Sequence, residues 1–329
     1  MNMLLAGLSF VNLIGRVPGG VSQGLIWGIM ALGVFITFRV LDIADLSVDG
    51  SFATGGAVAV MLSLAGLPTW VATICALIAG LIAGFVTGLL HAKLGIPAIL
   101  AGILTQFALY SINLRIMNMA ANQSINPAMY KLVISMRNIP IAILEGAVFA
   151  AILIAILYWY FGTEHGSALR STGNNGAMST ALGINISTMK IVGLSISNGV
   201  VAFAGALMAQ YQGFADVNMG RGAIVIGLAS IIIGEILCDA IFKKGCAFWI
   251  RMAFVVFGGI VYYLVMIIVL WLKLDPNDLK LFTALIVAIF LAVPYFKGKA
   301  KNSFGWAGRR SQPYVTAIQN SLKSGKEVR

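Results

Sequence analysis

The sequence contains few charged residues. Asp, Glu, Lys and Arg make up 10% of its 329 residues, whereas soluble domains contain roughly 25%. Hydrophobic residues make up 60% of the chain, and the mean hydropathy is +0.95. This composition excludes a soluble globular domain and predicts an integral membrane protein.

Two common signatures of catalysis are also lacking. The chain contains no G-x-x-x-x-G-K-[ST] loop and no H-E-x-x-H motif, and it has only two histidines. We therefore expect that the chain is not an enzyme and that any ATP hydrolysis belongs to a separate subunit. Its three cysteines, Cys75, Cys238 and Cys246, show no metal-ligand spacing. We expect neither a disulfide framework, nor a zinc site or other bound metal, nor a cofactor.

The apolar residues fall into separate runs of about 14–26 residues, with Gly and other small residues inside them. Such lengths suit helices that cross a hydrocarbon core of roughly 30 Å, and not the alternating pattern of a membrane barrel. The chain is thus predicted to be an all-α bundle of about nine transmembrane helices. Their expected positions are 21–38, 52–67, 70–90, 96–114, 141–161, 191–211, 224–237, 247–272 and 281–296.

The two ends of the chain differ from this transmembrane domain, residues 21–296. Residues 3–14 are apolar but too short to span, so residues 1–20 are expected to form an interfacial segment that ends at Pro18-Gly19-Gly20. Residues 297–329 carry +7 of the net charge of +11. A basic tail beside the last apolar run favours the cytoplasmic face and its anionic lipids over nucleic acid. The C-terminus is therefore predicted to be cytoplasmic.

One long polar interval, residues 162–190, separates two strongly apolar segments. Within it, residues 174–183 are predicted to form a short helix, because Asn174 or Asn175 can cap its start and Gly183 can end it. The order of basic residue, Gly, Asn, small-residue helix, Gly-Ile-Asn and Lys190 resembles the coupling loop of permeases in ATP-binding-cassette importers of the ribose and branched-chain amino acid type. On that resemblance, the coupling helix that docks on the ATPase comprises Asn174, Asn175, Gly176, Ala177, Met178, Ser179, Thr180, Ala181, Leu182 and Gly183.

An acidic cluster follows the first expected span, in the stretch LDIADLSVDGSF at residues 41–52. If this stretch is helical, the carboxylates of its three aspartates share one face. Three interpretations are open: a structural ion pair with Arg39, the lining of a transport path or gate beside a helix break, and a calcium site resembling half an EF-hand. The stretch is similar to the I-D-L-S-V-G-S motif of sugar-type permeases, but has an extra Ala and Asp. The predicted path or gate residues are Asp42, Asp45, Ser47, Asp49, Gly50 and Ser51.

Gly80, Gly84 and Gly88 recur every four residues in the third expected span. Glycines at this spacing share one helix face and let another helix approach closely. We expect them to serve helix packing, either within the chain or at a dimer seam.

The likeness to importer permeases covers residues 20–290 and implies a type II-importer-like fold in a bacterial cell membrane. It also implies a translocation path for a small polar solute, with an amino acid, including an aromatic one, ahead of a sugar or nucleoside. The implied partners are an ATPase subunit that binds ATP, a second and identical permease chain, an extracytoplasmic substrate-binding protein and membrane lipid, with no nucleic acid. A secondary transporter and a channel are the remaining alternatives.

Overall fold

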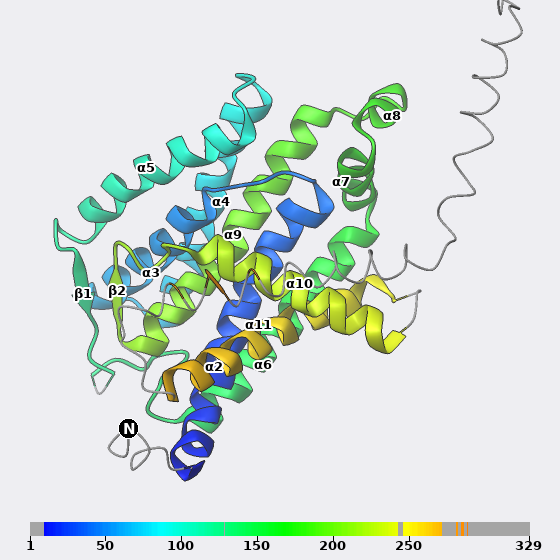
Figure 1. Cartoon of the computed structure of the whole chain (residues 1–329). Helices are drawn as coiled ribbons and strands as arrows, with labels where there is room; N and C mark the ends of the chain where they lie inside the picture. Colours follow the sequence, from blue (N-terminus) through cyan, green and yellow to red (C-terminus); the bar gives the residue numbers. More distant parts are fainter. Residues whose placement is uncertain are drawn as a thin grey trace, which may run out of the picture. The chain divides into compact units, whose positions relative to one another are not determined.

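The computed structural model describes residues 10–127, 129–242 and 246–271, together with positions 281, 284, 285 and 288. The helices and strands named below belong to one compact unit, residues 1–284, and residues 285–329 form a second unit. Figure 1 shows the first unit as a bundle of helices. The helices are α2 (Phe10–Phe35), the π-helical turn η1 (Ile36–Val40), α3 (Val48–Leu64), α4 (Thr69–Ala92), α5 (Ala98–Ile116), α6 (Ile139–Gly162), α7 (Glu164–Asn174), α8 (Gly176–Ala181), α9 (Ile186–Gln212), α10 (Ala223–Phe242) and α11 (Phe248–Trp271).

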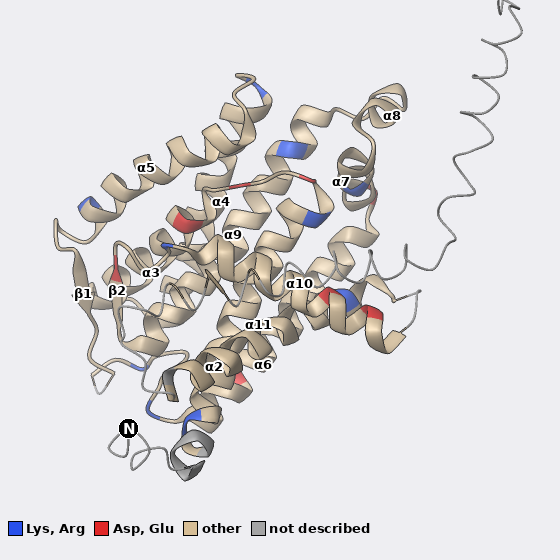
Figure 2. Ribbon diagram, viewed as in Figure 1, with Lys and Arg blue, Asp and Glu red and all other residues tan. Residues whose placement is uncertain are grey.

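Seven helical segments in the described part of the chain are long and apolar enough to cross a membrane. They are α2 with η1, α4, α5, α6, α9, α10 and α11, and α3 adds a shorter apolar helix of 17 residues. Figure 2 shows that charge lies mostly at helix ends and in connecting segments. The predicted helical membrane bundle is thereby confirmed. The ninth expected span and the basic tail lie outside the described residues, apart from isolated positions.

Helix α9 lies at the centre of the bundle, where it packs against α2, α3 and α4 and is buried over most of its length. The glycine face of α4 lies against its backbone. A β-carbon on Gly80 would come within 2.4 Å of the Asn198 carbonyl oxygen, and one on Gly84 within 2.2 Å of the Leu194 oxygen. One on Gly88 would lie 2.7 Å from a backbone carbon of Ile191. Because α9 occupies this face, the glycines serve packing within the chain.

The first described helix is longer than the sequence analysis predicted. Helix α2 runs without a break from Phe10 through Pro18 to Phe35, so the expected stop at residues 18–20 does not occur. Gly24 and Gly28 lie further along this helix, and β-carbons there would lie 2.6 Å from the Ile260 Cα and 2.8 Å from the Val256 carbonyl oxygen. These two glycines inside α2 therefore form a close seam with α11.

A small antiparallel sheet joins two connecting segments at the end of the bundle where α5 and α9 finish. Strand β1 (Asn122–Ser124) pairs with β2 (Phe214–Asp216), with Gln123 opposite Ala215. This pairing fixes the segment before α6 against the segment before α10. The expected spans 96–114 and 141–161 left the residues of β1 without a predicted element.

Candidate translocation site and coupling segment

The acidic stretch is not one helix. The π-helical turn η1 ends at Val40, Asp42 takes a left-handed conformation with φ of 55°, and α3 begins only at Val48. Asp and Asn tolerate this conformation better than most residues. The prediction that the three carboxylates share a helix face is therefore wrong, and each lies in a different environment.

Asp45 belongs to a buried polar network on α9. Its Oδ1 accepts hydrogen bonds from the Ser47 backbone N–H at 2.9 Å and hydroxyl at 2.6 Å, and its Oδ2 accepts one from Asn198 Nδ2 at 2.8 Å. The Asn198 Oδ1 accepts from the hydroxyls of Ser47 and Ser51. Asn198 lies near the middle of α9, so the break and the start of α3 lie at the mid-depth of the bundle. Irregular backbone at this depth is tolerated because protein covers it.

Asp49 connects α3 to the start of α10. Its Oδ2 accepts a hydrogen bond from the Gly222 N–H and its Oδ1 one from the Ile224 N–H, each at 3.0 Å. A carboxylate at a helix N-terminus satisfies unpaired N–H groups and interacts favourably with the helix dipole. Since Asp45 faces Asn198 and Asp49 faces α10, the two carboxylates have separate partners and do not converge on the common centre that a calcium loop requires.

A cavity of about 250 Å³ lies next to Asp49, between α3, α5 and the segment before α10. Gly50 lets α5 approach closely there, because a β-carbon on it would lie 3.2 Å from the Gln106 Cα. Of the six predicted path residues, Asp49 and Gly50 border this cavity. The lining comprises Asp49, Gly50, Gln106, Phe107, Tyr110, Asn113, Val217, Asn218 and Arg221.

Arg39 does not pair with the acidic stretch. Its guanidinium binds the carboxylate of Glu235 on α10 through two hydrogen bonds, one of them at 2.6 Å from Nε to Oε1. The interpretation that paired Arg39 with the aspartates is therefore wrong. Asp42 and Arg39 instead line a second cavity of about 540 Å³ beside α7, together with Arg170, Glu235 and Arg251.

The polar interval forms two helices rather than one. The predicted short helix is present as α8, capped by the Asn175 side chain, which accepts a hydrogen bond from the Met178 N–H at 3.0 Å, and followed by Gly183 with φ of 81°. Helix α7 precedes it and was not predicted, although its cap is a Thr-x-x-Gly start in which Thr163 accepts from the Gly166 N–H. Asn174 ends α7, and Leu182 follows α8 as its C-cap.

Helix α8 is fixed on one side and exposed on the other. Ser179 is buried and donates a hydrogen bond to the Asn175 carbonyl oxygen, and its hydroxyl also bonds to that of Ser171 on α7. Ala177, Thr180 and Ala181 are exposed. Met178 and Leu182 expose 61% and 66% of their surface. The segment therefore presents exposed apolar side chains outside the spanning helices.

Comparisons with known proteins agree with this architecture. Residues 17–294 match the family described as branched-chain amino acid transport system / permease component. The chain belongs to this permease family.

Two relatives and one solved structure were also found by comparison. A tyrosine transport system permease protein of Clostridioides difficile (strain R20291) is 41% identical over 271 residues, covering 82% of this chain and 88% of the relative. A nucleoside ABC transporter permease protein of Lactococcus lactis subsp. cremoris (strain MG1363) is 32% identical over 146 residues, covering 44% and 45%. The solved structure of PsaBC from Streptococcus pneumoniae in complex with Fab aligns at 14% identity with a TM-score of 0.47, covering 86% of this chain and 95% of that chain.

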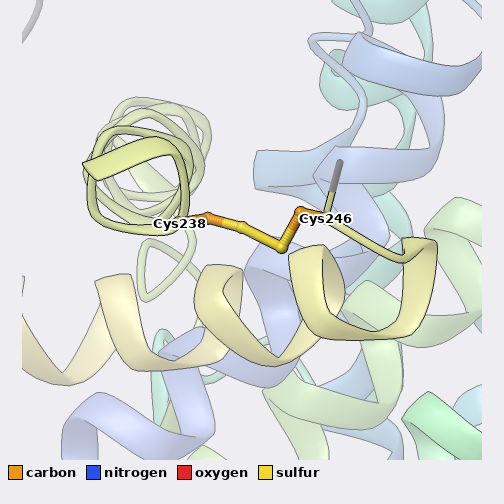
Figure 3. The surroundings of a disulfide bond; sticks show 2 residues. All are labelled: Cys238 and Cys246. Atoms are coloured by element: carbon orange, nitrogen blue, oxygen red, sulfur yellow. A yellow bond between two sulfur atoms is a disulfide. The ribbon is translucent and has the colours of Figure 1, made fainter. Parts of the chain in front are cut away.

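The permease contains a disulfide that the sequence analysis did not predict. Cys238, near the end of α10, is joined to Cys246, just before α11 (Figure 3). The two cysteines are eight residues apart in the sequence, which matches no metal motif. The sequence also does not show that the ends of α10 and α11 approach each other closely enough to bring the sulfurs together. The structure thus corrects the expectation that the cysteines form no disulfide framework. Cys75 is a free thiol on α4.

A serine motif in the permease has a structural explanation. Residues 20–24 read G-V-S-Q-G, which matches the G-x-S-x-G pattern of hydrolase nucleophiles. That chemistry requires the serine on a sharp strand-to-helix turn. Here Ser22 is buried inside the continuous helix α2 and is not on such a turn. Gly24 of the motif instead belongs to the close seam with α11.

Proposed function

We propose that this permease forms the translocation path of an ATP-binding-cassette importer for an aromatic amino acid, with tyrosine as the first candidate. The observation that carries the importer proposal is the capped and exposed surface of α8 on a chain of a transport family. A separate ATPase subunit binds ATP and docks on this surface. An extracytoplasmic binding protein delivers the solute, and a second identical permease chain completes the path in a bacterial cell membrane.

The geometry of α8 suits the transmission of movement. Exposed apolar side chains such as Met178 and Leu182 favour a protein partner over solvent. A side chain caps the start of each of α7, α8 and α9. Thr163 caps α7 and Asn175 caps α8. Asn185 caps α9 by accepting a hydrogen bond from the Thr188 N–H at 3.2 Å. A push on α8 is thereby passed to the central helix α9 as a rigid-body displacement rather than absorbed by a loose loop.

The substrate proposal is supported by similarity and by the cavity. The relative with 41% identity is named a tyrosine transport permease, and the match covers most of both chains. The cavity beside Asp49 combines aromatic side chains with groups of both charge signs, which suits a zwitterionic solute with an aromatic side chain.

The test is uptake by proteoliposomes that contain the permease with a P-loop ATPase and a binding protein encoded beside it. We expect ATP-dependent accumulation of labelled tyrosine in preference to leucine, ribose and a nucleoside. A preference for the nucleoside would retain the importer and replace its substrate. Uptake of every solute at the same rate without ATP would refute the importer.

A further inference from the structure

Asn113, near the end of α5, is a buried amide without a hydrogen-bond partner among the described residues. Its side chain is 1% exposed, and neither its amide nitrogen nor its amide oxygen is bonded. An unpaired buried amide is costly, and nearly all buried polar groups in native proteins have a partner. Asn198 illustrates the rule, because both ends of its amide are bonded within the α9 network. Asn113 therefore requires a partner that is not part of the described fold.

The cavity at Asn113 offers space for that partner. Its volume is about 250 Å³, below the roughly 300–1,000 Å³ of pockets for drug-sized molecules. A cavity of this size suits a small solute such as a single amino acid. It lies beside the start of α3, where the helix break reaches the mid-depth of the bundle.

Two groups of opposite charge border the same cavity. Arg221 contributes a guanidinium that forms no ion pair within the described part of the chain, and guanidinium groups bind carboxylates through paired hydrogen bonds. Asp49 contributes a carboxylate that accepts backbone hydrogen bonds from α10 and retains acceptor capacity for a further donor. Phe107 and Tyr110 add aromatic surface from α5.

We propose that Asn113 binds the transported solute and that this cavity recognises a zwitterionic amino acid. The Asn113 amide hydrogen-bonds to the charged end of the solute, Arg221 binds its carboxylate, and Asp49 binds its ammonium group. Phe107 and Tyr110 contact its side chain. The inference rests on the proposed function and adds the residues that select the solute.

The test uses direct binding of labelled tyrosine to the purified permease in detergent, without the ATPase. Asn113→Leu removes the amide at nearly constant volume. We expect the Kd to rise about tenfold or more, as for the loss of a hydrogen bond to a charged group. We expect the unfolding temperature to stay equal or rise, because an unpaired buried amide has been removed.

Two asparagine substitutions serve as controls. Asn122→Leu makes the same change at an exposed position on β1 and is expected to leave tyrosine binding unchanged. Asn198→Leu breaks a fully bonded amide and is expected to lower the unfolding temperature. If Asn113→Leu lowers the unfolding temperature as Asn198→Leu does, or leaves tyrosine binding unchanged, the proposal is overturned.

A substrate analogue tests the charge assignment. Arg221→Gln is expected to weaken tyrosine binding about tenfold, yet to leave binding of tyramine, which lacks the carboxylate, nearly unchanged. Equal effects on the two ligands, or no tyrosine binding to the wild-type permease, contradict the site. Binding that depends on Asn113 in a permease without ATP-driven uptake would retain this inference and reject the importer. ATP-driven uptake with an unchanged KM in Asn113→Leu would retain the importer and reject this inference.

Discussion

Two aspartates that lie only three positions apart in the acidic stretch have different environments. Asp42 is exposed at a left-handed turn, whereas Asp45 is 2% exposed and accepts three hydrogen bonds. An asparagine at position 45 would turn an N–H₂ group toward at least one of these donors. Leaving a buried donor unpaired costs about 1–3 kcal/mol.

We therefore expect Asp45→Asn to lower the free energy of unfolding by about 1–3 kcal/mol. The measurement is chemical or thermal denaturation of the purified permease. Asp42→Asn is the matched control and should be neutral, because asparagine adopts the left-handed conformation readily. Equal stability of the two variants would mean that the Asp45 network does not support the fold.

The sequence alone could identify this stretch but not the partners of its residues. Its acids, serines and glycine between two apolar runs indicate a break at mid-membrane. The partner of Arg39 is Glu235, which lies 196 positions away. Asn198 lies 153 positions from Asp45, and Asn113 lies 64 positions from Asp49. One sequence carries no information about such pairings, so neither the ion pair nor the cavity could be derived from it.

At the scale of elements, helix α8 gives the sharpest test of coupling. Ala177 and Ala181 are exposed, so two glutamates there should leave folding and membrane insertion intact while disturbing a close contact with the ATPase. We expect Ala177→Glu with Ala181→Glu to reduce ATP-driven uptake at least tenfold and to reduce co-purification of the ATPase. The control pair, Ala177→Ser with Ala181→Ser, keeps small side chains and should retain uptake. Normal uptake by the glutamate pair would count against docking at α8.

The seam between α4 and α9 is testable by adding a single methyl group. In Gly84→Ala the new β-carbon would lie 2.2 Å from a carbonyl oxygen of α9, so the helices must separate. We expect a lower unfolding temperature for this variant. Gly162→Ala, at a helical glycine with nothing within 4 Å of the added carbon, should instead be neutral or stabilising, since alanine favours helix by about 0.5–1 kcal/mol. The same loss of stability in both variants would show that close packing is not the cause.

The elements that were predicted correctly are those specified by local chemistry. Apolar run length set the spans, and Asn175 with Gly183 set the limits of α8. The elements that were missed depend on tertiary contacts. The β1–β2 pair joins segments about 90 residues apart, and the seam between α2 and α11 brings Gly24 against Ile260.

At the scale of the whole molecule, charge does not orient the described helices. Arg251 lines the same cavity as Arg39 and Arg170, so it lies at the α7 end of the bundle. With it, the basic residues at that end are Arg39, Lys93, Arg170, Lys190 and Arg251, and those at the other end are Arg16, Arg115, Lys131 and Arg137. Arg221 borders the cavity beside Asp49 and is counted with neither set. The two sets of described residues differ by one. An orientation argued from the positive-inside rule therefore depends on the basic tail, which lies outside the described residues.

Two other features favour opposite orientations. Coupling to an ATPase requires α8 in the cytoplasm. The disulfide between Cys238 and Cys246 lies where α10 ends, at the same end of the bundle as the Arg39–Glu235 pair, and disulfides persist mainly in oxidising compartments. If α8 is cytoplasmic, these two cysteines face a reducing solvent and are expected to be reduced in the cell.

Labelling of single cysteines can decide the orientation. In a background with Cys75, Cys238 and Cys246 replaced by alanine, we expect an impermeant maleimide to label Asn122→Cys on intact cells and Thr180→Cys only after permeabilisation. Asn122 precedes α6 and Thr180 follows it, and α6 is about 36 Å long by helical rise, enough to cross the membrane. In the wild-type permease, we expect Cys238 and Cys246 to react with a permeant thiol reagent in cells and to form their disulfide after purification in air. Labelling of Thr180→Cys on intact cells, with a disulfide already present there, would reverse the orientation and remove α8 from any contact with a cytoplasmic ATPase.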